Sequence, residues 1–194
     1  MMKRIFLDVE TGGLDPEADA LLEVCMRKES GEELQFYIDP PVGVLINPEA
    51  IEVNKIDLNK LKQEGKLIDE NYACTLIYDF LAGEKYIFIG YNIDFDLQFI
   101  KRLFKRNFLS YPSQIGSRYN IDLFSVCLFL KDTNKINPEN LKLQTLRDYF
   151  CIKFNGEGHT ARSDVYTTQK LYETLNEQFF NKWVRQCLKG LNLK

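Results

Sequence analysis

Short apolar runs separated by turn-forming residues dominate the first part of the chain. Residues 3–9, 20–26 and 34–38 are rich in apolar side chains, and each run has the length of a β-strand. Residues 29–32, with the sequence ESGE, separate the second run from the third and are typical of a tight turn. This spacing predicts a meander of three strands at the start of a sheet.

Beyond this meander the apolar residues recur every three or four positions, which is the period of an α-helix. Helices are predicted over residues 69–81, 94–108, 121–130, 141–149 and 162–180. Asn47-Pro48 also marks a helix start, because proline fits the first helical position. Residues 86–90 form a short, continuously apolar run that predicts one further, central strand. The chain is therefore expected to be α/β in class, with a mixed central sheet and helices on both faces.

Length and composition fit a single globular domain. The chain has 194 residues, of which 45% are apolar and 27% are charged. We expect one domain over residues 1–180, followed by a basic C-terminal tail, residues 181–194, that belongs to this domain or packs on it. Apolar residues near the tail either pack on the core or contact a partner, such as a DNA polymerase or a second copy of the chain.

Two further features of the sequence indicate where in the cell the protein is located. None of the five cysteines belongs to a C-x-x-C pair, and their number is odd, which favours a reducing compartment over a disulfide framework. The N-terminal apolar run is too short for a signal peptide, and no run approaches the length of a membrane span. The sequence therefore predicts a cytoplasmic protein that does not interact with a membrane.

The net charge is mildly acidic, at −3, which weighs against a protein that coats DNA. Residues 97–120 nonetheless contain no acid, and they carry five basic residues, Lys101, Arg102, Lys105, Arg106 and Arg118. One interpretation is an electrostatic guide for a single nucleic-acid strand, with Tyr111 or Tyr119 available for stacking. The other is an ordinary solvated helix face, and the sequence leaves both open.

Carboxylates lie beside three of the predicted apolar elements. Asp8 and Glu10 come at the end of the first strand, two residues apart and therefore on the same face of it. Further acids follow the strand at 86–90 or begin the last helix, namely Asp94, Asp96 and Asp164. Because the carboxyl ends of neighbouring strands meet at one edge of a sheet, we expect these acids to converge. Taken alone, Asp8 and Glu10 fit an ordinary solvated strand end as well as they fit a functional site.

Carboxylates gathered in one place repel one another unless a cation joins them. Oxygen ligands without thiolates select Mg²⁺ or Mn²⁺, and substrate phosphates commonly complete such sites. Because a pair of these ions suits in-line displacement at phosphorus, we expect two divalent metal ions and a phosphodiester substrate.

The only histidine, His159, lies in a glycine-containing loop five residues before Asp164. A lone histidine is usually an ordinary surface or core residue. Beside bound metal ions, however, an imidazole has a suitable pKa to accept a proton from attacking water. His159 is therefore a candidate general base.

Three motifs in a fixed order, D-x-E-T-x-G-L, x-N-x-x-F-D and H-x-A-x-x-D, make the chain recognisable. Over about residues 3–176 it resembles the DnaQ-like exonucleases of the DEDDh group, which include the proofreading epsilon subunit of DNA polymerase III and RNase T-type exonucleases. The resemblance implies a ribonuclease-H-like fold. It also implies that four acids are metal ligands and that the histidine is the general base: Asp8, Glu10, Asp96, Asp164 and His159. Asp94 is not a motif position and receives no role.

The resemblance further implies contacts to the terminal nucleotide of the substrate. The residues at matching positions are Thr11, Leu14, Asn54, Ile56, Asn92 and Phe95. Of these, Phe95 is more simply explained as a packing residue. Three positions depart from the family pattern, since Gly12 replaces a commoner second threonine and Tyr91 and Asn54 stand where histidine is frequent.

The function implied by the resemblance is a metal-dependent 3′→5′ exonuclease that releases nucleoside monophosphates from single-stranded 3′ ends, with DNA favoured. A 3′→5′ exoribonuclease or oligoribonuclease is the alternative within this class. A catalytically silent partner-binding module and a small-nucleotide hydrolase are alternatives from other classes. All four acids and the histidine are present, which counts against the silent module.

Overall fold

The computed structural model describes residues 2–116, 119–153 and 160–181 of the chain. Within these ranges the centre is a mixed sheet of six strands in the order β4-β3-β2-β1-β5-β6. The strands are β1 (Lys3–Thr11), β2 (Leu21–Lys28), β3 (Glu33–Ile38), β4 (Leu67–Ile68), β5 (Tyr86–Gly90) and β6 (Asn120–Asp122). The first three form the antiparallel meander that the sequence predicts. β5 and β6 extend the sheet parallel to β1, and β4 pairs in parallel with β3 at the other edge.

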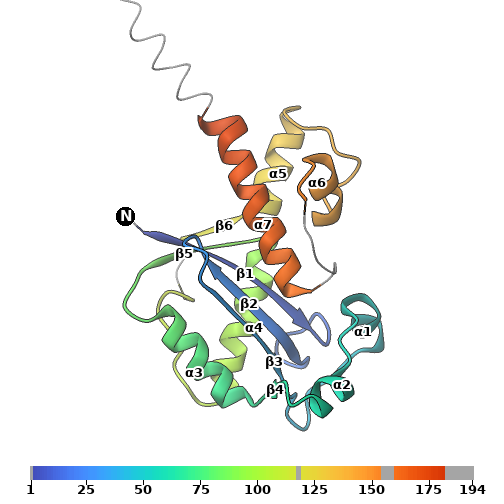
Figure 1. The fold of residues 1–194 in the computed structure, drawn as a ribbon, viewed down its shortest axis with the longest axis vertical. Coiled ribbons are helices and arrows are strands. Elements are labelled where there is room, and N and C mark those ends of the chain that lie inside the picture. Colours follow the sequence, from blue (N-terminus) through green and yellow to red (C-terminus); the bar gives the residue numbers. More distant parts are fainter. Residues whose placement is uncertain (1, 117–118, 154–159, 182–194) are drawn as a thin grey trace, which may run out of the picture.

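Helices cover both faces of this sheet (Figure 1). They are α1 (Pro48–Asn54), α2 (Leu58–Gln63), α3 (Glu70–Leu81), α4 (Ile93–Arg106), α5 (Leu123–Asp132), α6 (Leu143–Tyr149) and α7 (Ala161–Leu175), and α7 continues into the π-helical turn η1 (Asn176–Asn181). α3 and α4 lie on one face, whereas α7 lies on the other with α5 and α6 beside it. α1 and α2 pack on a smaller apolar cluster next to β2 and β3. The predicted α/β class with helices on both faces is confirmed.

The strand β1 divides the core because its side chains alternate between the two faces. Its odd-numbered residues from Ile5 to Val9 are buried in the cluster that contains α3 and α4. Phe6 points the other way and belongs to the cluster formed with α5, α6 and α7. Asp8 and Glu10 continue the series that Phe6 begins, so the backbone alternation directs both acids toward α7.

The helix predicted over residues 121–130 begins later than expected. Asn120–Asp122 form β6, and α5 starts only at Leu123. The Asp122 carboxylate accepts hydrogen bonds from the backbone N–H groups of Phe124, at 3.2 Å, and Ser125, at 3.1 Å. Asp122 is therefore the N-cap of the helix, and the apolar Ile121 before it belongs to the strand.

Two short elements and one helix end also differ from the sequence prediction. α2 and β4 have six and two residues, which is too short for a hydrophobic period to reveal them. A single helix was predicted over 162–180, but α7 ends at Leu175 and the chain continues as η1. The π-helical turn has a wider period than an α-helix, so the α-helical pattern does not show where the change occurs.

Every helix within the described ranges is too short or too polar to cross a bilayer. Four of the five cysteines lie in these ranges and are free thiols, with Cys25, Cys74 and Cys127 buried and Cys151 exposed. Residues 182–194, which make up nearly all of the predicted basic tail, lie outside the described residues.

A partly buried ion pair joins the start of α3 to the end of α4. Arg106 donates from Nη2 to Oε1 of Glu70 at 2.6 Å and from Nε to Oε2 at 3.1 Å. Only 7% of the Glu70 side chain and 17% of the Arg106 side chain are exposed. Replacing Glu70 with Ala would leave the guanidinium charge without its partner, so we expect the free energy of unfolding to fall by about 3 kcal/mol. Urea unfolding followed by circular dichroism measures this loss.

The matched control is Glu84→Ala, which breaks the exposed pair between Glu84 and Lys3. An exposed pair contributes little to stability, so this control is expected to unfold at nearly the wild-type urea concentration. Equal shifts for the two variants would contradict a structural role for the Glu70–Arg106 pair.

Candidate active site

Three carboxylates from two elements come together at the end of β1. Asp8 and Glu10 project from β1 toward α7, and Asp164 lies in the first turn of α7. One carboxylate oxygen from each of these three residues lies within 4.8 Å of the other two. All three side chains are only partly buried, so a cation from solvent can reach the group.

A capping box holds the first turn of α7, and with it Asp164, in place. Thr160 Oγ1 accepts a hydrogen bond from the backbone N–H of Ser163 at 3.2 Å. In return, Ser163 Oγ accepts one from the backbone N–H of Thr160 at 3.4 Å. Both backbone donors would otherwise lack a partner at the helix start, so the helix has a defined first residue and presents Asp164 to β1.

Asp96 is the fourth carboxylate and comes from the first turn of α4. It is 3% exposed, and its Oδ2 atom has no hydrogen-bond partner among the described residues. A hydrogen bond from the backbone of Val9 brings the carboxylate to the end of β1. A buried carboxylate oxygen without a hydrogen-bond donor is unfavourable unless a cation lies beside it. Asp96 and the three clustered carboxylates therefore fit the oxygen ligands of a divalent metal site.

The acids raise one another's pKa values, as expected for like charges in a low-dielectric site. Burial raises the pKa of Asp8 well above its ordinary value, and the charges of Asp96 and Asp164 raise it further. Burial, followed by the charge of Asp164, raises the pKa of Glu10 from 4.5 to about 8. Burial also raises the pKa of Asp96. A bound divalent ion would favour the ionised forms of the same groups.

A fifth acid beside the group, Glu23, was not among the predicted site residues. It lies in the middle of β2 directly opposite Glu10, and it is fully buried. Its Oε1 atom accepts a hydrogen bond from Nε2 of Gln35 at 2.6 Å, and the side chain of Tyr37 donates another. Burial raises the pKa of Glu23, although these hydrogen bonds to the carboxylate lower it in part.

Glu23 also connects the sheet to the helix that carries Asp164. Its Oε2 atom accepts a hydrogen bond from the backbone N–H of Ala161, the first residue of α7, at 3.3 Å. Both carboxylate oxygens of Glu23 therefore have hydrogen-bond donors, whereas Asp96 Oδ2 has none among the described residues. We call Glu23 an anchor because its hydrogen bonds hold the start of α7 against β2. An acid in the middle of the apolar run at 20–26 was the sequence signal that could have revealed it.

Three of the residues predicted to contact the terminal nucleotide, Thr11, Asn54 and Ile56, are buried and take part in hydrogen bonds between side chain and backbone. Thr11 Oγ1 donates to the carbonyl of Gly13 at 2.6 Å. Asn54 donates from Nδ2 to the carbonyl of Thr11 at 3.1 Å and accepts at Oδ1 from the N–H of Ile56 at 3.0 Å. Asn54 thus ties the end of β1 to the connection between α1 and α2. Contact of these three residues with a nucleotide stays a prediction.

The other three predicted contact residues are more accessible. Leu14 is exposed in the loop after β1. Asn92 is exposed, adopts a left-handed backbone with φ of 68°, and precedes α4 without a capping hydrogen bond from its side chain. Phe95 is half-buried, and its ring centroid lies 5.0 Å from that of Phe99. Phe95 has the packing contact expected from its place on α4, and its contact with substrate also stays a prediction.

Two departures from the family pattern have a packing explanation. A Cβ at Gly12 would lie 2.8 Å from the carbonyl oxygen of Leu45 and 3.1 Å from Cα of Ile46, so the neighbouring backbone occupies the space of a threonine side chain. Tyr91 donates from its hydroxyl to the carbonyl of Leu141 and meets the ring of Phe124 edge-on at 5.8 Å. Tyr91 thereby joins the end of β5 to α5 and to the segment before α6.

The candidate general base, His159, lies outside the described residues. Thr160, directly after it, is the N-cap of α7. Asp94 is exposed on α4 and does not belong to the carboxylate cluster, in keeping with its having no motif position.

The carboxylates that β1, α4 and α7 bring to one end of the mixed sheet form an arrangement that fits metal binding. The chain belongs to the exonuclease family described by the RNase_T model, which matches residues 5–172. The family resemblance seen in the three sequence motifs is therefore confirmed.

Individual relatives agree with this family. The chain is 28% identical over 192 residues to exodeoxyribonuclease I of Buchnera aphidicola subsp. Baizongia pistaciae (strain Bp), which covers 90% of this chain and 39% of the relative. It is 30% identical over 112 residues to ribonuclease T of Histophilus somni (strain 129Pt), covering 50% of each. The chain thus spans half or less of the length of these relatives.

The fold also matches solved structures. A crystal structure of E. coli exonuclease I in complex with a dT13 oligonucleotide aligns with a TM-score of 0.80 and 22% identity, over 96% of this chain and 43% of that one. This likeness confirms the expected ribonuclease-H-like fold.

The raised pKa values predict how the stability of the metal-free protein depends on pH. The folded pKa of Glu10 lies above its unfolded value, so its contribution to stability is fully present below about pH 4.5 and is lost as the pH rises to about 8. In a chelator, the melting temperature should fall by several degrees across this window. Saturating Mg²⁺ should remove the fall, because a cation favours the ionised carboxylates. A melting temperature that rises with pH in the chelator would contradict this account.

The anchoring contact of Glu23 can be tested with Glu23→Gln. The glutamine amide would direct N–H donors at a site already surrounded by donors, so α7 should be held less firmly against β2. We expect about a tenfold higher Mg²⁺ requirement for activity, which is measured by titrating the metal at fixed substrate. Glu139→Gln, at an exposed position, is the control and should leave the Mg²⁺ titration unchanged. A wild-type titration for Glu23→Gln would argue against the anchor.

Proposed function

We propose that this chain is a metal-dependent 3′→5′ exonuclease that releases nucleoside monophosphates from single-stranded DNA. The observation that carries the proposal is the convergence of Asp8, Glu10 and Asp164 within 4.8 Å, next to the buried Asp96. Membership of the exonuclease family supports the reaction type. Similarity to an exodeoxyribonuclease I over 90% of the chain supports DNA as the substrate.

In this proposal the four carboxylates, Asp8, Glu10, Asp96 and Asp164, hold two divalent ions, either Mg²⁺ or Mn²⁺. Bound there, the ions would stabilise the charge that develops on the phosphate during in-line displacement. The capping box at the start of α7 keeps Asp164 oriented toward β1, and Glu23 anchors the same helix to the sheet. The protein thereby supplies ligands whose positions are set before substrate arrives.

His159 is the proposed general base, and it would accept the proton of the attacking water. The support for this role is its place in the H-x-A-x-x-D motif, five residues before Asp164. Leu14, Asn92 and Phe95 are proposed to border the terminal nucleotide. Thr11 and Asn54 are proposed to shape the same pocket through hydrogen bonds to backbone carbonyls, together with Ile56, whose N–H donates to the Asn54 side chain.

A 3′→5′ exoribonuclease or oligoribonuclease is the second candidate. The observation in its favour is the 30% identity to a ribonuclease T, which extends over 50% of this chain. A small-nucleotide hydrolase would use the same carboxylates, with dinucleotides or nucleoside triphosphates as substrates in place of long strands. A catalytically silent module is disfavoured, because such a module does not need four converging acids.

We also propose a cytoplasmic location and a single exonuclease domain over residues 1–180. The three buried free thiols, Cys25, Cys74 and Cys127, support a reducing compartment. A DNA polymerase and a second copy of the chain are the proposed protein partners. Residues 181–194, with their basic side chains, are the segment proposed to pack on the domain or to contact such a partner.

Degradation of 5′-labelled single-stranded DNA and RNA of matched sequence tests the proposal. With Mg²⁺ or Mn²⁺ we expect a ladder that shortens from the 3′ end on DNA, and no ladder in a chelator. Asp8→Ala and Asp164→Ala should lower turnover by about a thousandfold or more, because each removes a metal ligand. Asp94→Ala, at an exposed neighbour of the second motif, is the control and should retain activity.

The outcomes separate the candidates. A ladder on RNA alone would replace the DNA assignment with RNA processing. Cleavage of dinucleotides or nucleoside triphosphates alone would identify a small-nucleotide hydrolase. Undiminished turnover in a clean preparation of Asp8→Ala would show that the carboxylate cluster is not the active site.

A further inference from the structure

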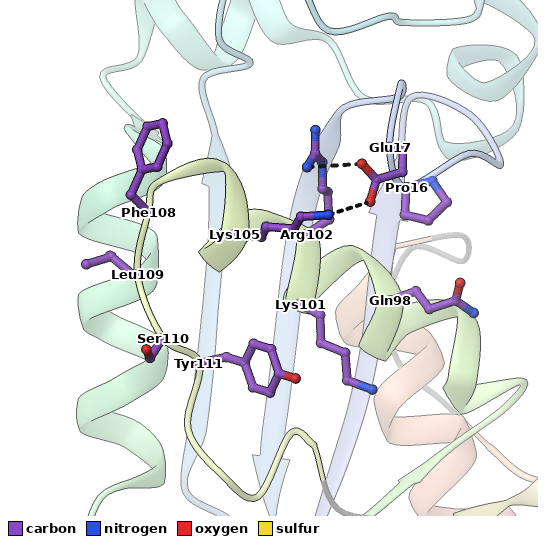
Figure 2. Close-up of a pocket in the computed structure, with 10 residues that line it drawn as sticks. All are labelled: Pro16, Glu17, Gln98, Lys101, Arg102, Lys105, Phe108, Leu109, Ser110 and Tyr111. Carbon is purple, nitrogen blue, oxygen red and sulfur yellow. Dashed lines mark ion pairs between the residues drawn. The ribbon is translucent and has the colours of Figure 1, made fainter.

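A crevice of about 810 Å³ lies on the outer surface of α4 (Figure 2). Its walls are α4, the loop that follows β1 and the segment that follows α4. Lys101, Arg102 and Lys105 line it from α4, Phe108 and Tyr111 from the following segment, and Glu17 from the loop. Basic and aromatic side chains thus meet in one concave surface, outside the carboxylate cluster.

The cations of this crevice differ in exposure, since Lys101 and Arg102 are partly buried and Lys105 is exposed. Arg102 Nη1 lies 3.0 Å and Lys105 Nζ 3.6 Å from the carboxylate of Glu17, which is itself 61% exposed. Lys101 makes no ion pair with any described acid. The pair with Lys105 is exposed on both sides and contributes little, and the buried Nε of Arg102 has no hydrogen-bond partner among the described residues. A phosphate group could therefore take the place of the exposed Glu17 carboxylate on both cations. Arg106, the fourth basic residue of α4, is committed to Glu70 and takes no part.

The two aromatic side chains of the crevice are exposed, and one of them lies on an unfavourable backbone. Phe108 is 99% exposed and has a left-handed backbone with φ of 55°. It follows the C-cap of α4, where glycine is the usual residue, so neither packing nor backbone preference accounts for a phenylalanine there. Tyr111 is also exposed, and its ring points along the crevice toward Lys101 (Figure 2).

Cations that track a phosphate backbone, combined with aromatic faces for the bases, are the chemistry of single-stranded nucleic-acid binding. The crevice shares two elements with the candidate active site. α4 begins with Asp96 and continues to Lys101 and Lys105, and the loop bearing Glu17 follows β1 directly. The upstream nucleotides of a strand bound at the carboxylates could therefore follow α4 toward the crevice.

We propose that this crevice binds the nucleotides upstream of the 3′ end of a single-stranded nucleic acid, with bases stacked on Phe108 and Tyr111. Phosphates contact Lys101 and take the place of Glu17 on Arg102 and Lys105. The inference rests on the proposed exonuclease function, because that function defines which end of the strand lies at the carboxylates. Glu17 acts as an internal competitor that keeps the cations occupied until a strand arrives.

Fluorescence anisotropy in a chelator measures binding without hydrolysis. The probes are 5′-labelled single-stranded DNAs, a trinucleotide and a strand of about 15 nucleotides. Phe108→Gly should weaken binding of the longer strand about fivefold or more and leave the trinucleotide unaffected. Glycine suits the left-handed backbone at this position, so the variant should be at least as stable as wild type and loss of binding cannot reflect misfolding.

Two charge variants test the phosphate contacts in opposite directions. Lys101→Gln should reduce the slope of log affinity against log salt by about 0.7, the value for one phosphate contact to a single strand. Glu17→Gln should bind the longer strand more tightly and with a steeper slope, because it frees Arg102 and Lys105. Phe129→Ala, at an exposed aromatic on α5, is the control and should bind like wild type.

Wild-type affinity for the longer strand in both Phe108→Gly and Lys101→Gln would overturn the proposal. Competition by polyglutamate as effective as by unlabelled DNA would also overturn it, since the crevice would then recognise negative charge alone. The two proposals fail separately. An inactive protein that still binds the longer strand through Phe108 contradicts only the exonuclease assignment, whereas hydrolysis with binding insensitive to Phe108 and Lys101 contradicts only the crevice.

Discussion

The crowding of like charges at the end of β1 is the constraint on which the rest of the structure depends. Asp8 and Glu10 share a face because β1 is extended, and Asp164 joins them because α7 packs across that face. Their repulsion opposes folding, so the apolar contacts of both sheet faces must outweigh it. Phe6 provides such contacts on the same face as the acids. The fold thus stores unfavourable electrostatic energy that a divalent cation would relieve.

The number of donors around each buried acid distinguishes an anchor from a ligand. Glu23 is surrounded by N–H and O–H donors from β3 and α7, so both of its carboxylate oxygens have hydrogen-bond partners within the protein. Asp96 keeps one buried oxygen without any donor among the described residues. Both acids lie beside the cluster of Asp8, Glu10 and Asp164. Of the two, only Asp96 has an oxygen that a cation could contact without displacing a hydrogen bond to a described residue. Burial alone would not separate the two roles, whereas the hydrogen-bond inventory does.

The parts predicted from the sequence are those with a local signature. Alternation along β1 placed Asp8 and Glu10 on one face, the strand at 86–90 placed Asp96 at its end, and the motif spacing made Asp164 a candidate. Glu23 was not predicted as a site residue because the apolar run around it indicates only a strand. Its position opposite Glu10 depends on the register of β2 with β1, which the sequence does not show. The pairing of Arg102 with Glu17 and the backbone that fills the space at Gly12 are tertiary contacts between distant segments. No periodicity encodes such contacts.

The alternation of β1 also bears on how chain length can change during evolution. Inserting or deleting one residue between Phe6 and Asp8 would turn both acids toward α4 and bring apolar side chains to α7. Substitutions in this stretch alter one contact, whereas a length change exchanges the two faces of the strand. The pairing of β1 with β2 already shifts between Glu10 and Thr11. Length variation among descendants of this chain should therefore be absent before Glu10 and begin in the loop that follows it.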